Sequence, residues 1–395
     1  MKKLCIFLLA ILSFQFLPAQ NVGFGPWSNC TQGISGYNPV VAGNQAVYFG
    51  NSVSISGNYA IIGGYKNAYI FFYNGTVWVQ QAILTPSDGL LQSETFGHTG
   101  VCIKGNRAIV GAIKKVGTKV NQGKAYIYTY DGFTWVEEQI LTSSDGTADD
   151  FFGNSVAINN DYAIVGAPYK DAGAAYIFKF NGTTWTEDAK LKSTLTGAAL
   201  FGSSVAINGT NALVGAFQSG GSGEVYAYSF KSGRPGLGGT ITPPQWNKIS
   251  TLKPKDILNL DLFGTRISID GNNAIIGAWG KTVDGKIGQG KAYIYTFNGR
   301  GWVEQDGLAA VDGLGGDGFG YHVGINGNYA IIGTENTNAA YIFQNVGGIW
   351  RQYQKVTDPG GAKFFSVAID NYRFLIGAPT VKNNTGMAYF GKIDP

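Results

Sequence analysis

Histidine is the residue type in this chain best suited to acid–base or metal chemistry, and the chain has two, His98 and His322. An imidazole can act as a general base, and several together can hold a metal ion. Both histidines closely follow a Phe-Gly pair ("FGHTG" and "FGYHV"), at a point where a strand should begin, and no other histidine exists to assist them. We interpret them as strand-entry residues and predict no catalytic residue, no metal site and no cofactor.

Carboxylates offer a second kind of chemistry. Glycoside hydrolysis needs two carboxyl groups about 5 to 9 Å apart, so a suitable pair would indicate a polysaccharide-active enzyme. The acidic residues instead gather in segments such as "SDG" and "VDG", which are ordinary turn sequences, and no spacing pairs them. The glycine-rich "GLGGDGFG" at 313–320 has no helix after it, so it does not indicate a phosphate site. The acidic loop residues are Asp88, Asp145, Asp149, Asp150, Asp312 and Asp317.

The elements that would position these side chains repeat seven times. An isoleucine is followed eight residues later by a glycine, then by a tyrosine and, in six copies, by a tryptophan. Consecutive isoleucines are 44 to 62 residues apart. Agreement of this kind along the chain marks an internal repeat. The isoleucines are Ile55, Ile103, Ile158, Ile207, Ile269, Ile325 and Ile369, and the glycines are Gly63, Gly111, Gly166, Gly215, Gly277, Gly333 and Gly377.

Each copy predicts four strands. In the copy at 152–178, "SVAI" alternates as a half-buried strand does, and "AIVGA" is a continuous apolar run. "AAYIFKF" follows after a loop, and the tryptophan opens a fourth strand after Asn-Gly or Asp-Gly, which favours a type I′ hairpin. Four antiparallel strands at this period indicate an all-β, seven-bladed β-propeller, with a β-solenoid as the alternative.

The two ends of the chain suggest how the ring closes. The last copy stops after its third strand and has no tryptophan of its own, whereas Trp27 precedes the first copy. We expect residues 21–47 to supply the outer strand of the last blade, which would otherwise expose an unpaired edge. The expected repeats are 48–95, 96–151, 152–200, 201–262, 263–318, 319–363 and 364–395.

Residues 1–20 are typical of a secretory signal peptide. Two lysines precede an apolar run from Leu4 to Leu17, which is too short to span a bilayer comfortably. We therefore expect export, to the periplasm, the cell surface or the medium, and no membrane span after cleavage. Cleavage would leave a net charge of +2, too weak to indicate nucleic-acid binding. Of the remaining cysteines, Cys102 falls in a column of small residues, and we expect no disulfide with Cys30.

These repeats resemble the FG-GAP repeats of the integrin α-subunit propeller and of exported bacterial proteins; "FGNSV…VGAP" at 152–168 is the closest copy. The resemblance covers about residues 48–395 and implies a propeller. Many members carry an Asp-rich calcium loop between the first and second strands, whereas the turns here, such as "SGNY" and "NNDY", are too short to wrap calcium. The resemblance therefore implies the fold without the metal.

The position of the proline in Gly-Ala-Pro varies most, and it opens the loop between the second and third strands. It holds Tyr65, Ile113, Pro168, Phe217, Trp279, Glu335 and Pro379. In the family that loop lies on the face that binds partners, and an aromatic ring beside lysines suits a protein or a glycan. Alternatively, these side chains cap the blade core. The candidate contact residues are Tyr65, Phe217, Trp279, Lys114 and Lys281.

We therefore interpret the chain as an exported, non-catalytic binding or adhesion module, expected to be a monomer. The alternatives are a polysaccharide-active propeller enzyme and a structural component of a cell surface.

Overall fold

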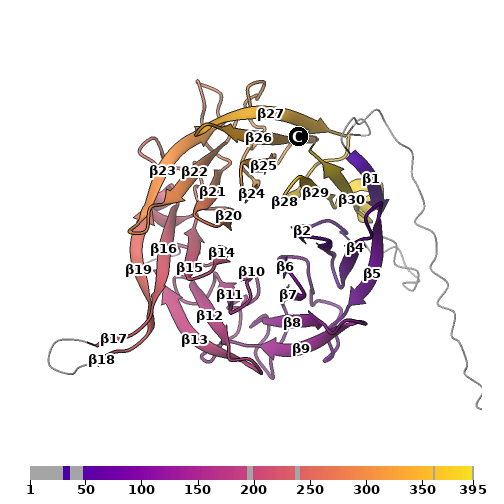
Figure 1. Ribbon diagram of the computed structural model, residues 1–395, viewed down its shortest axis with the longest axis vertical. Helices are drawn as coiled ribbons and strands as arrows, with labels where there is room; N and C mark the ends of the chain where they lie inside the picture. Colours follow the sequence, from indigo (N-terminus) through magenta and orange to yellow (C-terminus); the bar gives the residue numbers. More distant parts are fainter. Residues whose placement is uncertain (1–29, 36–47, 194–198, 236–240, 359–360, 394–395) are drawn as a thin grey trace, which may run out of the picture.

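Seven four-stranded antiparallel sheets form a closed ring around a central opening, which confirms the predicted seven-bladed propeller (Figure 1). The structure is a computed structural model and describes residues 30–35, 48–193, 199–235, 241–358 and 361–393. The first strand of each blade lies at the opening and the fourth lies at the rim. The ring rules out the solenoid.

The first three blades follow the predicted strand order without additions. Blade 1 contains β2 (Ser52–Ser56), β3 (Tyr59–Gly63), β4 (Ala68–Tyr73) and β5 (Trp78–Leu84). Blade 2 contains β6 (Val101–Lys104), β7 (Arg107–Ala112), β8 (Lys124–Tyr130) and β9 (Trp135–Leu141). Blade 3 contains β10 (Ser155–Ile158), β11 (Tyr162–Ala167), β12 (Ala174–Phe180) and β13 (Trp185–Lys192).

Blade 4 carries an insertion. It contains β14 (Ser204–Asn208), β15 (Asn211–Ala216), a 3-10 turn η1 (Ser219–Gly221), β16 (Glu224–Lys231) and β19 (Gln245–Leu252). Between its last two strands a two-stranded ribbon, β17 (Arg234–Pro235) and β18 (Ile241–Thr242), projects outward from the ring (Figure 1).

The last three blades complete the ring. Blade 5 contains β20 (Ile267–Asp270), β21 (Asn273–Ala278), β22 (Lys291–Phe297) and β23 (Trp302–Leu308). Blade 6 contains β24 (His322–Asn326), β25 (Tyr329–Gly333), β26 (Ala339–Val346) and β27 (Ile349–Thr357). Blade 7 contains β28 (Ser366–Asp370), β29 (Arg373–Ala378), the short helix α1 (Val381–Asn384) and β30 (Met387–Lys392).

The outer strand of blade 7 comes from the other end of the chain. β1 (Cys30–Ser35) pairs antiparallel with β30, from Cys30 opposite Gly391 to Ser35 opposite Met387. The predicted closure by the N-terminal segment is therefore confirmed, although Trp27 and residues 1–20 lie outside the described residues. Cys30 thus belongs to the rim of blade 7, whereas Cys102 lies on the inner strand of blade 2 and carries a free thiol.

The hydrophobic core lies between neighbouring blades. Each cluster of buried side chains draws on two consecutive sheets, including one cluster that joins blade 7 to blade 1. The tryptophan column belongs to these contacts: Trp78 stacks on Phe390 of blade 7 with ring centroids 4.4 Å apart, and Trp135 Nε1 donates to Gln81 of blade 1. The repeated tryptophan is therefore an inter-blade contact.

The Phe-Gly pair and the glycine of the second strand meet at a joint between blades, which we call the glycine joint. At the first one, the Gly97 amide donates to the Gly111 carbonyl of its own blade, and the Gly97 carbonyl accepts the Ser52 hydroxyl of the preceding blade at 2.6 Å. A Cβ on Gly63 would overlap that carbonyl, and Gly97 has a φ of +80°. Both positions therefore need glycine.

The predicted type I′ hairpins between the third and fourth strands are wrong. Gly75 has a φ of +99°, but Asn74 is not in the left-handed region. The Asn74 side-chain oxygen instead accepts the amides of Thr76 and Val77, and Asp131, Asn181 and Asn298 do the same at their turns. An Asx turn satisfies the backbone here without a second positive φ.

Removal of residues 21–45 should lower the midpoint of thermal unfolding by several degrees or cause aggregation, because β30 becomes an exposed edge. Shortening the ribbon β17–β18, which lies outside the four-stranded sheets, serves as the control. If the N-terminal truncation and the ribbon variant both melt with the full chain, β1 does not close the ring.

Candidate functional site

The propeller has two different faces. The connections after the first and third strands lie on one face, the turn face, and are tight turns except for the insertion of blade 4. The connections after the second and fourth strands are mostly longer and lie on the other face, the loop face. The described segments of the loop face are 64–67, 113–123, 168–173, 217–223, 279–290, 334–338 and 379–386 after the second strands, and 85–100, 142–154, 199–203, 253–266, 309–321 and 361–365 before the first strands.

An acidic column fixes the loops that lead from one blade to the next. Asp88 accepts hydrogen bonds from the Tyr126 hydroxyl of blade 2 at 2.8 Å and from Lys124 and Lys114. Asp145 and Asp256 bind Tyr176 and Tyr293 in the same way, at 2.6 and 2.8 Å. The recurring tyrosine of the third strand therefore anchors the loop of the preceding blade.

A second acidic column shapes the same loops. The Glu94, Asp150, Asp261 and Asp317 carboxylates each accept the backbone amide three residues earlier, at 2.6 to 2.8 Å. The acidic residues that could have suggested glycosidase chemistry are thus hydrogen-bond acceptors within the loops. Of the two remaining members, Asp149 accepts the Asn121 side-chain amide at 2.9 Å and Asp312 accepts the Lys355 ammonium at 2.6 Å.

The lysines predicted to support ligand contact are buried instead. Lys114 is 4% exposed and its ammonium contacts Asp88 and the Gly89 carbonyl; Lys281 is 6% exposed and its ammonium lies 3.0 Å from Asp261. Both charges brace the loops from beneath, and the predicted ligand contact of Lys114 and Lys281 stays a prediction. Lys170 does the same beside Asp150.

The three predicted aromatic residues are half-buried on the loop face but belong to separate blades. Tyr65 packs with Tyr48 and His98, with ring centroids 5.6 Å apart for the His98 pair. Trp279 packs edge to face against Tyr321 at 5.7 Å. Phe217 follows β15 in blade 4. No single site unites the five predicted residues; Trp279 and Lys281 share a loop, and the others do not.

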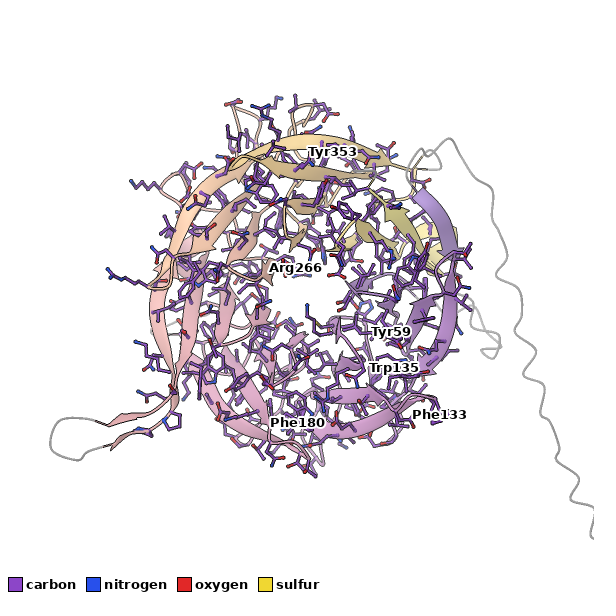
Figure 2. The ribbon with its side chains drawn as sticks, in the orientation of Figure 1. Tyr59, Phe133, Trp135, Phe180, Arg266 and Tyr353 are labelled. Carbon is purple, nitrogen blue, oxygen red and sulfur yellow. The ribbon has the colours of Figure 1, made fainter. Side chains whose placement is uncertain are left out.

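Arg266, His322 and Phe365 occupy positions where the glycine joint has other residues. A serine or threonine hydroxyl donates to the next blade's glycine carbonyl at five joints, from Ser52, Thr99, Ser155, Ser204 and Ser366. Arg266 and His322 replace this serine in blades 5 and 6, and Phe365 replaces the Phe-Gly glycine of blade 7. Figure 2 places Arg266 beside the central opening.

The replaced positions form one cluster with Trp279 and Tyr321. Tyr321 packs against Trp279, His322 and Phe365, and the Arg266 guanidinium lies 6.0 Å from the Tyr321 ring centroid. We call these five residues, Arg266, Trp279, Tyr321, His322 and Phe365, the blade 5–7 cluster. All five are half-buried.

Burial sets the electrostatics of this cluster. It lowers the pKa of His322 well below the ordinary value, with a further contribution from the Arg266 charge, so the imidazole is neutral at neutral pH. Burial also raises the pKa of Tyr321 and of the neighbouring Glu335. His322 Nε2 is enclosed and has no hydrogen-bond partner among the described residues.

The central channel, of about 230 Å³, offers no comparable set of polar groups. Its wall is the inner strands, including the small column with Cys102, Ala157 and Gly324. Asp270 and Asp370 border its turn-face end, and each accepts the backbone amide of the next blade's turn, from Gly327 and Gly57. The channel's carboxylates are therefore engaged in inter-blade contacts.

The described segments contain no group of three or more His, Cys, Asp or Glu side chains placed to hold a metal ion. In the same part of the chain, no helix combines the length and the apolar character needed to cross a bilayer.

Sequence reasoning missed the blade 5–7 cluster, although a signal existed. When the seven copies are aligned on the Ile column, the position three residues earlier holds serine in four blades and Arg266 and His322 in two consecutive ones. The regular spacing of five or six residues between the two acidic columns also marked a structural role.

Replacing Asp88 with Asn should lower the free energy of unfolding by about 1 to 3 kcal/mol at pH 7, because buried Lys114 loses its carboxylate. Despite partial burial, hydrogen bonds from Lys114, Lys124 and Tyr126 lower the pKa of Asp88 to about 2. Since that pKa lies below its unfolded value, this stability is present above about pH 4 and lost as the pH falls toward 2.

Urea unfolding at pH 7 and pH 3 measures this effect. The difference between wild type and Asp88→Asn should shrink at the lower pH. Asp284→Asn, at an exposed aspartate of the loop face, is the matched control. Equal stability of Asp88→Asn and wild type at pH 7 would show that the acidic column does not anchor the loops.

Calcium should have no effect on stability. The turns that hold calcium in related propellers are here reduced to short hairpin turns, such as the one in which Ser56 pairs with Tyr59. Thermal melts with a chelator and with millimolar calcium should superimpose. A rise of several degrees with calcium would reveal a site that this account lacks.

Comparison with known proteins agrees with the geometry. The family model described as FG-GAP repeat matches residues 78–128, 135–178, 185–228, 246–295 and 302–343. All five segments start at the tryptophan of one blade and run into the third strand of the next, so each spans a glycine joint. No curated protein sequence matches the chain.

Solved structures show the same architecture at low identity. The β-propeller domain of Cps50 (Swd1) from Myceliophteria thermophila has a TM-score of 0.58 at 9% identity, covering 93% of this chain and 99% of that one. A chain of the mitotic checkpoint complex has a TM-score of 0.57 at 10% identity, covering 100% of both chains. These likenesses concern the fold alone. Because the FG-GAP segments span more than half of the sequence, the chain belongs to the FG-GAP repeat family.

Proposed function

We propose that the chain is an exported, non-catalytic binding module whose loop face contacts a partner protein. The observation that carries this proposal is the set of half-buried aromatic rings on the loop face, which sit on loops braced by buried ion pairs. Rigid aromatic side chains supply contact area at a low cost in conformational entropy. FG-GAP propellers suggest a protein-binding module, and this surface is consistent with one.

Exposed apolar side chains on the same loops favour a protein partner. Ile287 is 78% exposed and Leu314 is 66% exposed, and the Gly316 amide donates to the Ile287 carbonyl, so the two loops lie side by side. Leu260 is 74% exposed and lies next to the loop that carries Trp279. The Leu260 carbonyl is so close to Gly280 of that loop that a Cβ on Gly280 would overlap it. Apolar groups gathered around aromatic rings are typical of protein interfaces.

The other functions remain alternatives to this proposal. A polysaccharide-active enzyme would need a free pair of carboxylates, and the two acidic columns are used within the loops. A glycan ligand would share the aromatic surface, and a structural role at a cell surface would need no partner at all. Export rests on the signal sequence at residues 1–20, and the monomeric state is likewise part of the proposal.

Photo-crosslinking tests which face binds. Benzoylphenylalanine would replace Tyr169, 56% exposed on the loop face, or Phe133, 92% exposed at a turn-face hairpin (Figure 2 labels Phe133 at the rim). In an extract of the source organism's envelope and medium, position 169 should yield a defined crosslinked protein. Because Phe133 is more exposed, non-specific capture would favour position 133, and that result would contradict the proposal.

Trp279→Ala should weaken binding of the captured protein by about 2 kcal/mol, as expected for an aromatic hot spot. The thermal midpoint should change little, because the ring is half-buried and contacts Tyr321 only at its edge. Surface plasmon resonance and a thermal melt measure the two quantities. Unchanged affinity with a lower melting temperature would mean that Trp279 caps the blade core.

A further inference from the structure

We propose that the blade 5–7 cluster binds a carboxylate of the partner protein, through the guanidinium of Arg266. This inference rests on the proposed function and names the chemistry that the loop face recognises. The ligand is an acidic side chain on a peptide segment that lies over Trp279 and Tyr321.

The Arg266 charge is not neutralised by any group in the part of the chain that the structure describes. Among the described residues the guanidinium pairs with no carboxylate, and its hydrogen bond runs from Nη1 to the Thr265 carbonyl at 2.9 Å. Two other half-buried arginines lie on inner hairpins and are better satisfied: Arg107 binds the Glu138 carboxylate at 3.2 Å, and Arg373 donates to the Gly57 carbonyl and to Asn58 Oδ1 of the next blade. A half-buried cation with free donors favours an anionic ligand.

Arg266 stands at a position where four other blades have the serine that forms the glycine joint. Serine at this position gives the hydrogen bond of the glycine joint in blades 1, 3, 4 and 7, at 2.6 to 2.8 Å. In blades 5 and 6 the chain gives up this contact at two consecutive joints and places a cation and a histidine there. Positions that break a structural rule without local compensation are typical of functional sites.

The charge of the cluster indicates the charge of the ligand. The cluster contains one cation, and Glu335 lies close enough to Tyr321 to raise its pKa together with burial. One guanidinium with the Glu335 carboxylate nearby matches the single charge of a carboxylate ligand better than the double charge of a phosphate dianion. A planar carboxylate also fits the fork of a guanidinium, and the surrounding rings exclude water from the pair.

The experiment observes Arg266 directly in the full chain. The side-chain Nε–Hε resonances of ¹⁵N-labelled protein are recorded at low salt, and the Arg266 signal is assigned by its loss in Arg266→Ser. The probes are the capped tetrapeptides Gly-Glu-Tyr-Gly and Gly-Gln-Tyr-Gly and a glucuronic-acid disaccharide.

We expect a saturable shift of the Arg266 resonance with the Glu peptide and none with the Gln peptide. An equal shift with the Gln peptide, a shift with sodium chloride alone, or no shift overturns the proposal, and a shift with the disaccharide alone overturns the peptide assignment.

Arg266→Ser provides a variant that should fold, because it restores the residue found at the equivalent position of four other blades. We expect its thermal midpoint to equal or exceed that of wild type, and its affinity for the Glu peptide, followed by peptide-observed NMR, to fall about tenfold or more. Arg300→Gln removes the same charge at an exposed hairpin on the turn face of the same blade and should bind normally. Equal loss in both variants would indicate a general charge effect and overturn the proposal.

Failure of this inference can be distinguished from failure of the proposed function. Benzoylphenylalanine at position 169 can be placed in the wild-type chain and in Arg266→Ser. If both crosslink a partner with equal yield, and the Glu peptide does not shift the Arg266 Nε–Hε resonance, the loop face binds a protein without this carboxylate contact. If no partner is captured at the loop face but the Glu peptide binds, the anion site stands and the broader function does not.

Discussion

The glycine joint is the contact on which the rest of this propeller depends. A carbonyl from one blade approaches the second strand of the preceding blade so closely that a Cβ on Gly63 or Gly166 would overlap it. The same carbonyl accepts a hydroxyl from the preceding blade, and the glycine that carries it has a positive φ. Blade spacing is thus set by backbone contact, which leaves little freedom for the angle between neighbours. The aromatic Phe–Tyr pairs, such as Phe96 and Tyr126 at 5.3 Å, then fill the space behind each joint.

The sequence predicted the fold well because the glycine of the second strand recurs in all seven copies, and at six of them a Cβ would overlap a backbone carbonyl of the next blade. The constant eight-residue step from Ile to Gly follows from the pairing of Ser52 with Gly63 across a two-residue turn, and the missing last strand pointed to β1. The site was predicted less well because its chemistry depends on partners from other blades. In the sequence Lys114 and Lys281 resemble ordinary surface charges, because their ion-pair partners, Asp88 and Asp261, come next to them only in the folded chain. The roles of Tyr126 and Asp88, which lie 38 positions apart, likewise emerge only when two blades are side by side.

Because the glycine joint repeats around the ring, the blades in which its residues differ can be identified. At the other joints the glycine carbonyl accepts a serine or threonine hydroxyl, whereas the joints after blades 5 and 6 have an arginine and a histidine in place of that hydroxyl. Such an arrangement is expected to cost stability, and natural proteins accept that cost chiefly at functional positions. The proposed binding surface is therefore asymmetric: a sevenfold scaffold supplies rigidity, and one sector of the loop face supplies the chemistry. His98 packs with Tyr48 and Tyr65 in another aromatic group on this face.

Hydrogen–deuterium exchange of the chain with and without its captured partner tests this asymmetry most directly. The account predicts slower exchange in residues 260–266, 279–290 and 314–322, with the turns of the opposite face unchanged, because the partner is held by one sector of the loop face. Protection of the turns between the first and second strands, or protection spread evenly over the loops of all seven blades, would contradict it.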